Sequence, residues 1–94
     1  LRAHNARWRD WLRQRLASNR IRVPPSQGNF VLALFDDADT ARAAFEALRA
    51  KGLLVREVHS YGLPQGLRIS IGREEHVRGV VTVSQAFGAR GAID

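Results

Sequence analysis

Hydrophobic positions follow two different periods along the chain, and the changes between them mark its elements. Over residues 1–18 the apolar side chains recur at helical spacing. They are Leu1, Trp8, Trp11, Leu12 and Leu16. Pro24 and Pro25 prevent the helix from continuing, because proline lacks the amide donor and restricts the residue before it. Residues 29–35 then form an uninterrupted apolar run, which predicts a central strand buried on both faces.

The second half of the chain predicts two more helices and two more strands. Asp37 or Asp39 is suited to cap a helix that runs to Lys51 and ends at Gly52. Residues 53–58 are expected to form a second strand, and residues 59–66 a loop with Tyr61 at its tip. Residues 66–72 alternate as a third strand, expected to pair antiparallel with the second. A last helix is expected from residue 73 until Gly88 ends it, followed by a loose tail.

The predicted order is therefore α-β-α-β-β-α, with no repeat and no internal boundary. This order places the chain in the α/β (α+β) class. We expect one small domain over residues 1–94, with a three-stranded, largely antiparallel sheet and helices packed on it.

Composition limits the classes of partner. The net charge of +6 would suit a nucleic-acid-binding protein, but the arginines of the first helix spread over a solvated face. The absence of cysteine excludes disulfides and thiolate metal sites. No apolar run approaches the roughly 20 residues that span a bilayer, and there is no signal-peptide pattern. We therefore expect a cytoplasmic protein that binds neither nucleic acid nor membrane.

Motifs for self-contained catalysis are missing from the sequence. It has no glycine-rich phosphate loop and no nucleophile elbow. His4, His59 and His76 lack the spacing of metal ligands. Lys51 lies in the last turn of a predicted helix, where a cation complements the exposed carbonyls. We expect no catalytic, cofactor-binding or metal site within these residues.

Arg68 is the strongest candidate binding residue. In the third strand Leu67, Ile69 and Ile71 share one face, and Arg68 lies on the other with Ser70. An arginine presents a planar fork of donors that matches a carboxylate or a phosphate. On a rigid strand it would act as an anion clamp. The alternative is an arginine on the wet face of a sheet, paired with a nearby acid.

Five motifs together resemble a known family. They are HNARWR at residues 4–9, PSQGNFVL at 25–32, VR at 55–56, YGLP at 61–64 and LRISIG at 67–72. In this order and spacing they resemble the C-terminal domain of histidinol-phosphate aminotransferases, over nearly the whole chain. These are fold type I enzymes, in which a large domain holds pyridoxal phosphate on a lysine and a small domain closes over the substrate. The resemblance implies that residues 1–94 are the small domain and that the large domain is absent.

The resemblance also implies three substrate-binding residues. Arg68 matches the arginine that grips the anionic end of the substrate, which is a carboxylate in glutamate and a phosphate in histidinol phosphate. Asn29 matches an asparagine before the small-domain strand. Arg78 falls where some members have a second phosphate-contacting arginine, although its spacing from Glu74 equally suits an ion pair.

Two further arginines lie close to these motifs. Arg56 matches the family's strand arginine, and we assign it a structural role. Arg73 stands where the family commonly has a small residue after the strand glycine. Because of this difference, the resemblance does not fix the identity of the substrate.

Taken together, the resemblance implies transamination between histidinol phosphate and 2-oxoglutarate in histidine biosynthesis. Pyridoxal phosphate and a homodimer are implied for the full-length enzyme. The 94 residues alone are expected to be inactive and to hold no cofactor, because Lys51 does not match the family's cofactor lysine. The alternatives are an aminotransferase for aromatic or other amino acids, a free-standing basic module that binds RNA or a small anion, and a domain that docks through its tryptophan stripe.

Overall fold

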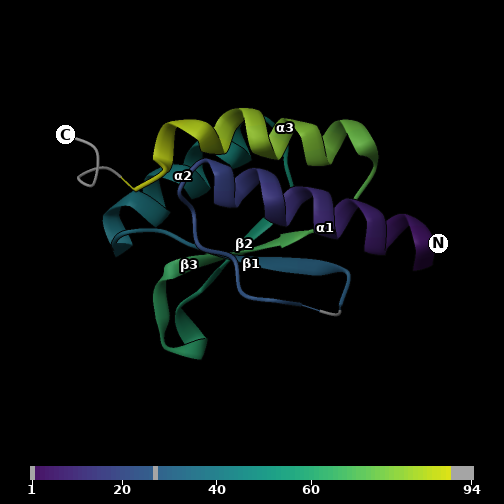
Figure 1. The fold of residues 1–94 in the computed structure, drawn as a ribbon. Helices are drawn as coiled ribbons and strands as arrows, with labels where there is room; N and C mark the ends of the chain where they lie inside the picture. The colour runs from purple at the N-terminus through teal and green to yellow at the C-terminus, as the bar shows by residue number, and fades with distance from the viewer. Residues whose placement is uncertain (1, 27, 90–94) are drawn as a thin grey trace.

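Three helices cover one face of a three-stranded antiparallel sheet in the computed structural model of the protein, which describes residues 2–26 and 28–89 (Figure 1). The elements are α1 (Arg2–Ser18), β1 (Phe30–Leu34), α2 (Ala38–Ala50), β2 (Val55–Val58), the 3₁₀ helix η1 (His59–Tyr61), β3 (Leu63–Ser70), α3 (Glu74–Ser84) and the 3₁₀ helix η2 (Gln85–Phe87). The predicted fold class and element order are confirmed. Leu1 and most of the predicted tail lie outside the described residues.

The prediction that residues 29–35 form the central strand is wrong. The strand order is β1-β3-β2, so that β3 lies in the middle and pairs with both neighbours. Among the described residues, β1 pairs with no further strand on its outer side and makes an isolated bridge there, between Arg22 and Leu34. Val31 and Ala33 are fully buried under the helices, whereas Phe30 and Leu32 are only partly buried on the opposite face. The helices therefore bury β1 on one face only, and the predicted burial on both faces is not found.

A tight reversal makes β3 longer than predicted. The chain leaves β2, forms η1, and turns at Gly62, whose φ of 75° is the left-handed conformation that glycine adopts easily. This reversal lets β3 begin at Leu63 instead of residue 66, and the strand ends at Ser70. Tyr61 is 67% exposed beside the turn, as the sequence predicted.

The core lies between the sheet and the helices. Its fully buried side chains come from every layer. They include Leu12 and Leu16 of α1, Leu48 of α2, Leu67 and Ile69 of β3, and Val77 and Val80 of α3. The apolar positions predicted for each helix thus face the same side of the sheet, and β3 contributes its alternate residues to this core.

Local signals set the ends of α2. Asp37 caps the helix by accepting a 2.8 Å hydrogen bond from the Thr40 backbone N–H. Hydrogen bonding with the side chain and backbone of Thr40 lowers the pKa of Asp37. Gly52 follows the helix with a φ of 74°, as predicted.

The end of α3 differs from the prediction. The helix stops at Ser84, and η2 carries the chain on to Gly88, which approaches the end of α1. Within the described residues no helix is both long and apolar enough to cross a membrane.

Candidate functional site

Arg68 lies on the face of the sheet that the helices leave open. Its neighbours Leu67 and Ile69 are fully buried under the helices, so that the alternation of β3 directs Arg68 to the other side. The side chain is partly buried there. Its guanidinium carbon lies 4.3 Å from the centre of the Phe30 ring. A rigid, central strand therefore carries this cation at a fixed place on the open face.

Arg56 joins Arg68 on the same face. The two residues are direct partners in the register of β2 and β3, and side chains that are opposite each other in an antiparallel pair project to one side. Two like charges so placed repel each other unless an anion lies between or beside them. None of the ion pairs among the described residues involves either arginine. The pair therefore presents unneutralised positive charge, and the structure adds Arg56 to the candidate site.

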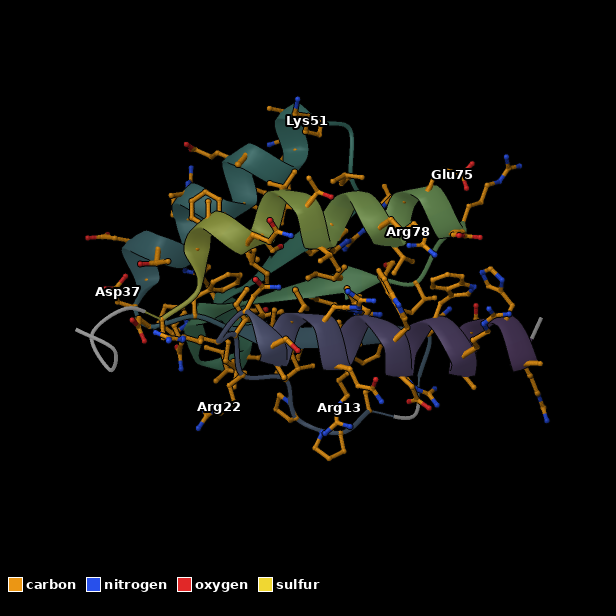
Figure 2. The ribbon with its side chains drawn as sticks, turned by 45° about the horizontal axis from the view of Figure 1, so that its top comes forward. Arg13, Arg22, Asp37, Lys51, Glu75 and Arg78 are labelled. Atoms are coloured by element: carbon orange, nitrogen blue, oxygen red, sulfur yellow. The ribbon has the colours of Figure 1, made fainter. Side chains whose placement is uncertain are left out.

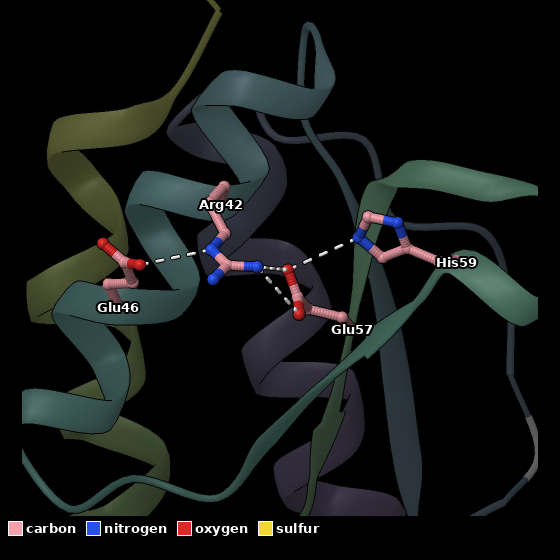
Figure 3. Close-up of polar contacts among 4 residues, drawn as sticks. All are labelled: Arg42, Glu46, Glu57 and His59. Atoms are coloured by element: carbon pink, nitrogen blue, oxygen red, sulfur yellow. Dashed lines mark hydrogen bonds and ion pairs between the residues drawn. The ribbon is translucent and has the colours of Figure 1, made fainter.

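The acid nearest to Arg56 in the sequence is engaged elsewhere. Glu57 accepts hydrogen bonds from Arg42 Nη1 at 3.2 and 3.4 Å, and its Oε2 lies 3.4 Å from His59 Nε2 (Figure 3). Arg42 Nε also donates to Glu46 at 3.2 Å. The two carboxylates raise the pKa of Arg42. This network joins α2 to β2 on the helical side, so that Glu57 does not neutralise Arg56 or Arg68.

Asn29 is exposed just before β1. Its backbone carbonyl accepts a 2.8 Å hydrogen bond from the Ile71 N–H, which places it at the end of the sheet where β3 finishes. Its side chain lines a hollow with α1 residues that include Asn5 and Arg9. The structure thus places Asn29 beside α1. No hydrogen bond among the described residues joins its side chain to Arg68.

Arg78 lies between α3 and α1, on the helical side of the sheet (Figure 2). Its Nε donates to Glu74 at 2.7 Å, which is the ion pair that the sequence spacing allowed. Its guanidinium also lies 5.4 Å from the Trp8 ring and 5.1 Å from the Trp11 ring. The structure therefore does not bring Arg78 together with Arg68. Trp8 is 6% exposed and packs in the core, whereas Trp11 is only partly buried against it.

Lys51 is the only lysine of the sequence. Lys51 is exposed at the C-terminal end of α2, where its backbone N–H bonds to Leu48 (Figure 2). The described residues also contain no group of three or more potential metal ligands. What this arrangement can do chemically is bind an anion on the open face.

His76 has a structural role that the sequence did not reveal. Its Nε2 accepts a 2.8 Å hydrogen bond from the Leu54 N–H, directly before β2. The ring must therefore be neutral, with its proton on Nδ1. Burial lowers the pKa of His76. This bond joins the first turn of α3 to the strand that carries Arg56.

We expect this bond to make folding sensitive to acid. Because the folded pKa lies below the unfolded value of about 6.5, the unfolded chain binds more protons as the pH falls below that value. Stability is then lost on acidification until the pH passes the folded pKa. His76→Gln keeps an acceptor that does not titrate, so that the part of the loss due to the titration of His76 should disappear. Melting temperatures at pH 8 and pH 5 test this, and an equal loss in both proteins would contradict it.

Comparisons with known proteins identify the class. The chain belongs to the aminotransferase class I and II family, whose model matches residues 1–83. Over 90 residues it is 51% identical to the histidinol-phosphate aminotransferase of Rhodospirillum rubrum, covering 94% of this chain and 24% of that protein. The histidinol-phosphate aminotransferase of Paracoccus denitrificans is 47% identical over 90 residues, with 96% and 24% covered.

A solved structure is also similar. A candidate aminotransferase from Burkholderia pseudomallei superposes with a TM-score of 0.78 at 28% identity, covering 89% of this chain and 25% of that one. The family resemblance inferred from the sequence is thereby confirmed. The chain spans about a quarter of the length of the curated relatives that it matches.

Proposed function

We propose that this chain is the C-terminal small domain of a pyridoxal-phosphate-dependent aminotransferase that acts on histidinol phosphate and 2-oxoglutarate. The observation that carries the proposal is the Arg68–Arg56 pair, which lies on the open face of the sheet and takes part in no ion pair among the described residues. The relatives that match most of the chain are named as histidinol-phosphate aminotransferases, which supports the choice of substrate.

In this proposal Arg68 binds the anionic end of each substrate. A guanidinium can donate two parallel hydrogen bonds to a carboxylate or to a phosphate, so that one residue serves glutamate and histidinol phosphate in turn. Its contribution to the rate is positioning, since it holds the amine of the substrate at a fixed distance from the reacting centre. Arg56 adds positive charge beside the bound anion. Asn29 and Arg78 stay predictions as substrate contacts.

The cofactor belongs to another part of the protein in this proposal. Members of this family are generally dependent on pyridoxal phosphate, which supplies the electron sink for transamination. In this proposal the lysine that holds it belongs to the large domain, and Lys51, which is exposed at the end of α2, is not that residue. We therefore expect the 94 residues alone to be inactive, and the full-length protein to be a homodimer with a cofactor-binding large domain.

The absorbance spectrum of the full-length protein with pyridoxal phosphate tests the proposal. We expect the cofactor band to change when histidinol phosphate is added and to return when 2-oxoglutarate is added. A response to an aromatic or another amino donor, but not to histidinol phosphate, would move the protein to a different aminotransferase activity. Absence of any cofactor band would contradict the proposal. The alternative of a free-standing basic module has no support from the comparisons.

A further inference from the structure

We propose that Phe30 is a positioning residue for Arg68, whose guanidinium it holds in place without occupying the N–H groups that bind the anion. The inference rests on the proposed function, since it concerns the same anion-binding arginine. It assigns a specific task to a residue that the sequence shows only as part of an apolar run.

The register of the sheet brings the two side chains together. Phe30 pairs with Ser70, and Leu32 pairs with Arg68, so that Phe30 and Arg68 are diagonal neighbours on the open face. The 4.3 Å between the guanidinium carbon and the ring centre is the shortest arginine–aromatic distance among the described residues. Phe30 is partly buried, so that water is partly excluded from the contact and the attraction is strengthened.

The type of partner matters for binding. A carboxylate would hold Arg68 through its N–H groups, which are the groups that an incoming anion needs. An aromatic ring attracts the cation through its π face and leaves the donors in the guanidinium plane available. Arg42 and Arg78 also lie near aromatic rings, but both donate to carboxylates in this structure. Arg68 differs from them because it has an aromatic partner and takes part in no ion pair among the described residues.

The Phe30 ring also packs against the backbone of Gly28. A Cβ on Gly28 would lie 3.0 Å from Phe30 Cε2 and 3.2 Å from Cδ2, so that the Gly28 backbone packs directly against the ring. Arg9 Nη1 donates a 2.9 Å hydrogen bond to the Gly28 carbonyl and fixes this backbone to α1. The Phe30 ring therefore has Arg68 over it and the Gly28 backbone against its edge.

The test uses the full-length protein, with the KM for histidinol phosphate and competition by inorganic phosphate as separate measurements. Phe30→Leu keeps an apolar side chain but removes the π face. We expect it to raise the KM and to weaken phosphate binding by about three- to tenfold, with kcat unchanged. Phe30→Tyr keeps the ring and should restore both values. Leu32→Val, on the same face without a π system, serves as the packing control and should leave both values unchanged.

Arg68→Ala separates the possible outcomes. If Phe30 acts through Arg68, Phe30→Leu should have no further effect in the Arg68→Ala background. An equal effect in both backgrounds, or no effect of Phe30→Leu where Arg68→Ala weakens binding, would overturn the inference and keep the proposed function. No effect of Arg68→Ala itself would overturn the proposed function.

A second variant covers the case in which Phe30→Leu fails to fold. Gly28 lies in an exposed turn, and a Cβ at this position would press on the Phe30 ring. Gly28→Ala should therefore displace the ring and also raise the KM. A wild-type KM in folded Gly28→Ala would count against the inference.

Discussion

Arg68→Ala in the full-length protein is expected to lower kcat/KM for histidinol phosphate by about 100-fold or more. Each hydrogen bond from a charged donor contributes about 1.5–3 kcal/mol, and a bidentate contact contains two of them. Every 1.4 kcal/mol corresponds to about tenfold in an equilibrium or rate ratio. Because Arg68 projects to the open face between two core residues, its loss should leave the melting temperature nearly unchanged.

Arg49→Ala is the charge-matched control. Arg49 lies exposed on α2, where its guanidinium is 5.5 Å from the Phe45 ring, and alanine is a good helix former. Steady-state kinetics with both substrates should show wild-type values for this variant. If Arg68→Ala and Arg49→Ala lowered kcat/KM by the same small factor, the effect would come from the lost net charge. Arg68 would then not be the anion clamp.

Gly88→Ala is expected to destabilise the domain by about 1–3 kcal/mol, the usual cost of overpacking. A Cβ at this position would clash with the backbone carbonyl oxygen of Asn19, and a backbone atom cannot move aside as a side chain can. The cause is space and not conformation, because Gly88 has a φ of −68° that any residue adopts. The hydrogen bond from the Ala89 N–H to the Arg20 carbonyl, at 3.1 Å, holds the same two segments together.

Gly79→Ala, in the preceding helix α3, provides the comparison. Its Cβ would lie 3.4 Å from a flexible Leu53 side chain, and alanine is favoured over glycine in a helix by about 1 kcal/mol. Thermal unfolding should therefore show a lower melting temperature for Gly88→Ala and an equal or higher one for Gly79→Ala. A melting temperature of Gly88→Ala equal to wild type would show that the two segments separate readily.

Local features were predictable from the sequence, and the order of the strands was not. The helix cap and the Gly52 helix end depend on residues within one turn. The sequence offered Asp37 or Asp39 as the cap, and the structure has Asp37, while Gly52 ends the helix as predicted. The apolar run at residues 29–35 indicated a strand but not its position. An edge strand is as apolar as a central one when one face packs on helices and the other is partly buried, so that periodicity cannot separate the two.

The same limit applies to the site. Arg68 was visible because a charged residue interrupts an alternating apolar strand. The position of Arg56 opposite it depends on the register of β2 and β3, which the bulge at residues 57–58 makes irregular and which no short-range pattern specifies. Phe30 looked like a core residue, since an aromatic side chain in an apolar run gives no sign of a cation above it. The His76 contact with Leu54 joins residues 22 positions apart and was equally hidden.

The alternation of β3 has a consequence for how this domain can change during evolution. Alternate residues of this strand have different tasks. Leu67 and Ile69 lie in the core and stabilise the fold, and Arg68 lies between them on the open face, where a ligand can bind. Point substitutions on the open face can therefore retune the ligand while the core is conserved. Insertion or deletion of a single residue would exchange the two sets, burying the charge and exposing the aliphatic side chains. The length of β3 is thus under tighter constraint than the identity of its outward-facing residues.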